Sequence, residues 1–174
     1  MAITDKVDAI HDARKVSGKT IPLAPSFALT ILEAASLEVE GDIQELWAGL
    51  IANCTDPGKA FNIKKVYVKT LQELQPLDAT ILRALFKNGV QEHHLFLTGT
   101  PLNAERLAET ISADLMDVQI SIQSLASLGC LIDSWNETIA SIDAGYAGFR
   151  VNNSNSNFRL SHLGAQLLLA TSNH

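Results

Sequence analysis

The chain has 174 residues, of which 47% are hydrophobic, enough for one compact domain or two small packed subdomains. Its 13 basic and 19 acidic residues give a net charge of -6, which disfavours nonspecific attraction to nucleic acid or to an anionic membrane. Cys54 and Cys130 fit no metal-ligand or CxxC spacing, so we expect free buried thiols and no metal or cofactor. No signal peptide or membrane-length apolar run is visible, so a soluble cytoplasmic protein is expected.

Residues 1–76 are predicted to form an all-helical subdomain. Residues 2–17 show the pattern of a polar, mixed-charge helix that ends at Gly18. Residues 26–39 are apolar almost all round, which is typical of a helix surrounded by others. This segment is therefore predicted to be a central helix.

The clearest helical periodicity begins at Gly41 and Asp42 and is stopped by a turn at residues 56–58. The stripe expected to be buried consists of Ile43, Leu46, Trp47, Leu50, Ile51 and Cys54. Helical spacing resumes over residues 62–72, before Pro76 breaks the pattern.

Residues 77–174 follow a different plan. A helix capped by Asp78 and ended by Gly89 is followed by a short strand over residues 95–98. Two helices come next, capped by Asn103 and Ser112, and Gly129 closes the second. The second of these should bury Leu115, Val118, Ile122 and Leu125.

Residues 130–135 and 158–160 are predicted to form the two strands of a wing, with Ser161 capping a last helix. The order helix, strand, helix, helix, strand, strand, helix is that of a winged helix-turn-helix. The sequence thus predicts a mainly α protein. Its helical N-terminal half packs on a C-terminal winged helix-turn-helix of α+β type, with a small wing sheet.

The expected recognition helix has the wrong chemistry for DNA. No Lys or Arg occurs between Leu107 and Phe149, where a DNA-binding protein needs positive charge. With about 100° between successive residues, the face opposite the buried stripe carries Met116, Asp117, Ile120 and Ser124. These four residues are the candidates for a contact with a protein partner or with a second copy in a homo-oligomer. Cover by the rest of the chain explains the same pattern equally well.

The alternative function is a DNA-binding transcriptional regulator. In that interpretation Gln123 is the base reader, and Arg150 and Arg159 beside the wing tip reach the minor groove. Two arginines on a hairpin are more often solubilising, so nucleic acid is the less favoured partner.

Other polar clusters favour structural roles. Acidic residues at a helix N-terminus are stabilised by the helix dipole; here they are Glu38, Glu40, Asp42 and Glu45. The only basic cluster, expected to be a solvated face, consists of Lys59, Lys64, Lys65 and Lys69. His93 and His94 are adjacent, so they could not readily share a metal, and Ser161 beside His162 serves better as a cap than as a nucleophile. With no motif for catalysis, a non-enzymatic protein is predicted.

Two segments, residues 37–53 and 68–79, resemble a known bacterial family. The first contains Leu46-Trp47-Ala48-x-Leu50-x-Ala52-Asn53, and the second contains Leu74-x-Pro76-x-Asp78-Ala79. Together they resemble the abortive infection alpha family, a domain of unknown function. The resemblance implies a role in bacterial defence against phage, or a related regulatory role, and it supplies no catalytic or binding residues.

Overall fold

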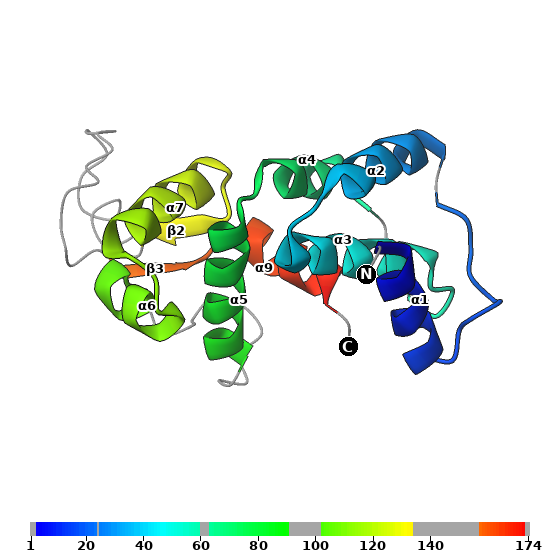
Figure 1. Cartoon of the computed structure of the whole chain (residues 1–174), viewed down its shortest axis with the longest axis horizontal. Helices are drawn as coiled ribbons and strands as arrows, with labels where there is room; N and C mark the ends of the chain where they lie inside the picture. Colours follow the sequence, from blue (N-terminus) through cyan, green and yellow to red (C-terminus); the bar gives the residue numbers. More distant parts are fainter. Residues whose placement is uncertain (1–2, 24, 60–62, 91–101, 134–156, 173–174) are drawn as a thin grey trace. The chain divides into compact units, whose positions relative to one another are not determined.

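The computed structural model describes residues 3–23, 25–59, 63–90, 102–133 and 157–172 (Figure 1). The chain forms two compact units, one made of Met1–Pro76 with Gln166–His174 and the other of Leu77–Ala165. Both units are mainly helical, and the described strands all belong to one small sheet in the second unit.

The first unit is built from helices around α3 (Gly41–Thr55). α1 (Ile3–Ala13) and α4 (Lys65–Glu73) both contact α3, while α2 (Pro25–Leu37) contacts α4. The second half of α9 (His162–Thr171) completes this unit. The helix predicted over residues 2–17 is shorter than expected, since Lys15 already takes a left-handed conformation with φ 59°.

The central helix of the first unit is α3. The predicted stripe is buried except for Cys54, which is half-buried, and Ala48, Gly49 and Ala52 on the other sides are buried as well. Small side chains let neighbouring helices approach closely, so α3 is enclosed on nearly every side.

The prediction that residues 26–39 form the central helix is wrong. In α2 only Ile31 and Ala35 are buried, whereas Leu29 is 67% and Leu32 is 54% exposed. An apolar sequence without a clear period is compatible with burial on every side of a helix. Such burial also requires other elements packed around the helix, and the helix's own sequence does not show whether they are there.

The second unit begins with α5 (Pro76–Val90), whose first residue belongs to the other unit. Proline is well suited to the first helical position because its missing N–H needs no partner there. Asp78 therefore lies inside the first turn and is buried, and the helix continues through Gly89. The predictions that Asp78 caps this helix and that Gly89 ends it are both wrong.

α6 (Ala104–Ile111) and α7 (Leu115–Ser127) follow each other closely and pack together. Asn103 caps α6 as predicted, since its side-chain oxygen accepts a hydrogen bond from the Arg106 N–H at 2.9 Å. Ser112 does not cap α7. It ends α6 in a left-handed conformation with φ 54°, and the turn then places Asp114, whose carboxylate accepts from the Met116 N–H at 2.8 Å, at the start of α7.

The sheet is antiparallel and three-stranded, with β3 (Asn157–Leu160) between β1 (Leu102–Asn103) and β2 (Leu131–Asp133). The predicted pairing of residues 130–135 with 158–160 is confirmed for the described strands. The strand expected over residues 95–98 lies outside the described residues, and β1 was not predicted.

The start of α9 packs tightly on the residue before β2. Ser161 caps the helix as predicted, because its hydroxyl accepts from the Gly164 N–H at 2.9 Å and donates to the Gly129 carbonyl. A Cβ atom at Gly164 would lie 2.3 Å from the Cys130 carbonyl oxygen. Only glycine allows this close approach of helix to strand.

Candidate functional site

The outer face of α7 is the surface that the sequence singled out, and it is exposed. Met116 is 63% and Ile120 is 58% exposed, Asp117 is exposed, and Ser124 is half-buried. Large apolar side chains that are open to solvent on one helix face are typical of contact surfaces. We call Met116, Asp117, Ile120 and Ser124 the α7 face.

The opposite side of α7 faces the core of its own unit. Val118, Ile122 and Leu125 are buried as predicted, whereas Leu115 is 38% exposed. The prediction that Leu115 is buried is wrong. Leu115 is the first residue of the helix, where no preceding turn covers it.

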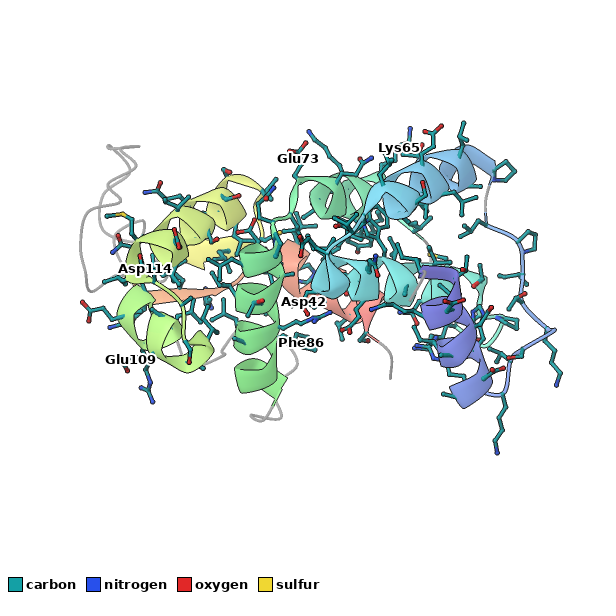
Figure 2. The ribbon with its side chains drawn as sticks, in the orientation of Figure 1. Asp42, Lys65, Glu73, Phe86, Glu109 and Asp114 are labelled. Atoms are coloured by element: carbon teal, nitrogen blue, oxygen red, sulfur yellow. The ribbon has the colours of Figure 1, made fainter. Side chains whose placement is uncertain are left out.

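The charge around the α7 face is negative. Glu109 on α6 and Asp114 at the start of α7 are labelled in Figure 2, and Asp117 adds a third carboxylate. From Leu107 to Asp133 the described chain contains no Lys or Arg. A phosphate backbone approaching α7 would meet repulsion where a DNA-binding helix provides attraction.

Of the residues named in the alternative DNA-binding interpretation, the structure describes two, Gln123 on α7 and Arg159 on β3. Gln123 is exposed on α7, but Arg159 is only half-exposed, with its Nε atom buried, on the middle strand opposite Ile132. Arg150 lies outside the described residues. The DNA-binding roles of Gln123, Arg150 and Arg159 therefore stay a prediction.

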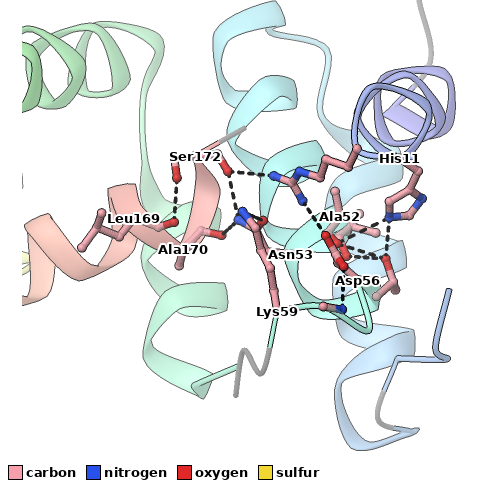
Figure 3. A network of polar contacts seen from close by, with 12 residues as sticks. His11, Ala52, Asn53, Asp56, Lys59, Leu169, Ala170 and Ser172 are labelled. Carbon is pink, nitrogen blue, oxygen red and sulfur yellow. Dashed lines mark hydrogen bonds and ion pairs between the residues drawn. The ribbon is translucent and has the colours of Figure 1, made fainter. Parts of the chain in front are cut away.

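A buried polar network in the first unit was missed by the sequence analysis (Figure 3). The side-chain amide of Asn53 on α3 donates to the Ala170 carbonyl at 2.7 Å and to the Ser172 carbonyl at 3.1 Å. The Asn53 oxygen accepts from the Lys59 ammonium at 3.0 Å. The last carbonyls of a helix have no partner within the helix, so Asn53 satisfies the end of α9.

The same network reaches α1. The Arg14 guanidinium donates to the Ser172 carbonyl at 3.3 Å and pairs with the Asp56 carboxylate at 3.5 Å. His11 is buried, and its Nε2 lies 3.0 Å from the Thr55 hydroxyl. Positive groups at the C-terminal end of a helix are favoured by its dipole, so these contacts fasten α1 and α9 to α3.

Lys59 belongs to this network and not to a basic surface. Desolvation by burial lowers the pKa of Lys59, and the nearby Arg14 lowers it further. Lys64, Lys65 and Lys69 are exposed as predicted for a solvated face. Including Lys59 in that cluster was wrong.

Comparison with protein-family models shows which family the chain belongs to. A family model described as abortive infection alpha matches residues 2–171, which is nearly the whole chain. The protein belongs to the abortive infection alpha family. No curated protein and no solved structure matches it.

The segments that resembled the abortive infection alpha family have structural roles here. In the first segment Trp47 and Leu50 are almost fully buried in the core, and Asn53 fastens the end of α9. In the second, Leu74 is buried after α4, and Pro76 begins α5. The family match covers far more of the chain than these two segments, which mark only its most regular part.

The acidic group around the start of α3 is structural, as predicted. Glu40 lies at the N-cap position, Asp42 lies in the first turn, and Glu45 pairs with Lys6 at 3.7 Å. The Glu38 carboxylate accepts from the Glu40 N–H at 2.8 Å. Negative charge at this end of a helix is favoured by the helix dipole.

Both cysteines are free, and burial raises the pKa of each thiol to about 11. A thiol with this pKa carries little thiolate near neutral pH and is a poor nucleophile.

Among the described residues, no three His, Cys, Asp or Glu side chains come together in a group that could hold a metal. His162 is exposed next to the capping Ser161, and His93 and His94 lie outside the described residues. No helix in the described part of the chain has the length and apolar character needed to cross a membrane.

Proposed function

We propose that this protein is a non-enzymatic interaction or sensor module of bacterial phage defence, and that the α7 face binds a protein partner. The observation that carries the proposal is the exposure of Met116 and Ile120 within an acidic surrounding. Membership of the abortive infection alpha family supports the defence context. In this proposal the protein acts in the cytoplasm.

The second unit is, in this proposal, a winged helix used for protein contact. The order of α5, β1, α6, α7, β2 and β3, with β3 in the middle of the sheet, supports that architecture. α7 then occupies the place of a recognition helix. Its surface offers apolar contact area and negative charge, which suit a protein with an apolar patch and a basic rim.

Phage plating on the natural host tests the α7 face. We expect Met116→Ser with Ile120→Ser to abolish protection, since losing both apolar contacts costs about 2 kcal/mol, or roughly thirtyfold in partner affinity. Ile21→Ser, at an exposed apolar residue of the first unit that lies outside the α7 face, is the control and should keep protection. Circular dichroism must show that both variants are folded. Full protection by the double serine variant would refute the proposal.

DNA binding gives a second, independent outcome. The purified protein should show no shift of duplex DNA in gels at low ionic strength, with random or upstream sequences. A shift that weakens as salt rises, and that Gln123→Ala removes, would establish the regulator in place of the interaction module.

A further inference from the structure

A second exposed apolar surface lies in the first unit, on α2. Leu29 and Leu32 are three residues apart on one side of the helix, and Leu37, its last residue, and Val39 are 81% exposed each. Another side of α2 carries the buried Ile31 and Ala35 and the half-buried Phe27, Ala28 and Ala34. Large apolar side chains left exposed beside such a stripe are typical of a contact surface.

α4 lies beside α2 and presents a basic face. Lys65, Val66 and Lys69 are exposed on α4, and Figure 2 shows Lys65 at the edge of this unit where α2 and α4 run. Within the described residues neither Lys65 nor Lys69 takes part in an ion pair. The long aliphatic stems of the two lysines, together with Val66, form a half-apolar surface with positive ends.

The charges of the two helices are complementary. Glu33 is exposed on α2 close to Leu29 and Leu32, and within the described residues it forms no ion pair either. α2 therefore offers leucines with a negative group, and α4 offers lysine stems and Val66 with positive groups. The two contacting helices thus carry both halves of a matching contact.

We propose that this surface binds a second copy of the chain, with α2 of each copy lying on α4 of the other. A two-fold interface makes every contact twice, so a surface that joins an acidic apolar helix to a basic one complements itself. Leu29 and Leu32 then pack on Val66 and the lysine stems, and Glu33 meets Lys65 and Lys69 of the other copy. An anionic membrane is a poorer occupant because the chain has a net charge of -6.

Sedimentation equilibrium of the full chain tests the apolar part. The wild type should be a dimer, and Leu29→Ser with Leu32→Ser should raise its dissociation constant by about a hundredfold or more. Met116→Ser with Ile120→Ser is a control of similar exposure on α7, and it should leave the dimer intact. A monomeric wild type, or a dimer that only the α7 control disrupts, would overturn the proposal.

Charge reversal tests the pairing of α2 with α4. Lys65→Glu with Lys69→Glu should weaken the dimer by about tenfold or more, because Glu33 then faces like charge in both halves of the interface. Adding Glu33→Lys should restore most of the lost affinity, which mere damage to α4 would not allow. Absence of restoration in a folded triple variant overturns this arrangement. Met116→Ser with Ile120→Ser tests the proposed function, and the variants of α2 and α4 test the dimer. Either proposal can therefore be refuted while the other stands.

Discussion

Two consecutive helices, α2 and α3, have similarly apolar sequences but differ in how far they are buried. α3 is enclosed from Leu46 to Asn53, whereas α2 buries only Ile31 and Ala35 and exposes Leu29 and Leu32. Apolar content alone therefore does not decide which helix becomes the core. Small residues do not decide it either, since α2 contains Ala28, Ala34 and Ala35; the two helices differ in how many of their sides neighbouring elements cover.

α3 is covered on more sides than α2. Ala48, Gly49 and Ala52 allow close contact on the sides that the leucines leave free, and Asn53 forms hydrogen bonds with the end of α9. In α2 the contact side is one stripe, formed by the buried Ile31 and Ala35 with the half-buried Phe27, Ala28 and Ala34. The remaining apolar residues of α2 are then available for intermolecular contact.

A matched pair of leucines gives the largest expected difference. Leu50 on α3 is 0% exposed and Leu29 on α2 is 67% exposed. Leu50→Ala should lower the free energy of unfolding by about 2–5 kcal/mol, through lost burial and a cavity. Leu29→Ala should change it by less than about 0.5 kcal/mol. Urea denaturation at concentrations where the chain is monomeric measures both, and equal losses would show that α2 is covered within its own unit.

Loss of the hydrogen bonds of Asn53 on α3 should give the next largest decrease in the free energy of unfolding. Asn53→Ala should cost about 2 kcal/mol, because the carbonyls of Ala170 and Ser172 lose their buried donor. Gln44→Ala at the other end of α3 is the control, since its amide donates to the Glu38 carbonyl in a half-buried site and should cost less. Thermal unfolding of both variants would contradict this ranking if Gln44 proved the more costly.

The sequence predicted those elements that depend on local periodicity and local caps. The period of Leu46, Trp47 and Leu50 and the cap at Asn103 act within a few residues, so they can be identified without the fold. Contacts between distant segments could not be found in this way. The hydrogen bond from Asn53 to Ala170 joins residues 117 positions apart, and no local pattern marks either of them as a partner of the other.

The same distinction applies to the candidate surfaces. The α7 face was predicted because an amphipathic helix has a recognisable outer side, which Met116 and Ile120 occupy. The surface on α2 was missed because an apolar helix without a clear period shows no outer side in its sequence. Which leucines remain exposed then depends on how many neighbours the fold supplies.

A small effect on α2 itself gives the sharpest test of its independence. Thr30 is exposed within α2, and alanine has the higher helix propensity by about 0.6 kcal/mol. If α2 opens locally while α3 stays folded, Thr30→Ala should slow hydrogen exchange of the α2 amides by about threefold. The α2 amides should then exchange at a free energy well below that of global unfolding, because only Ile31 and Ala35 of α2 are fully buried. Asn53→Ala on α3 should leave the α2 exchange rates unchanged, since α3 stays folded in that opening. Faster exchange of the α2 amides in Asn53→Ala would mean that the two helices unfold together.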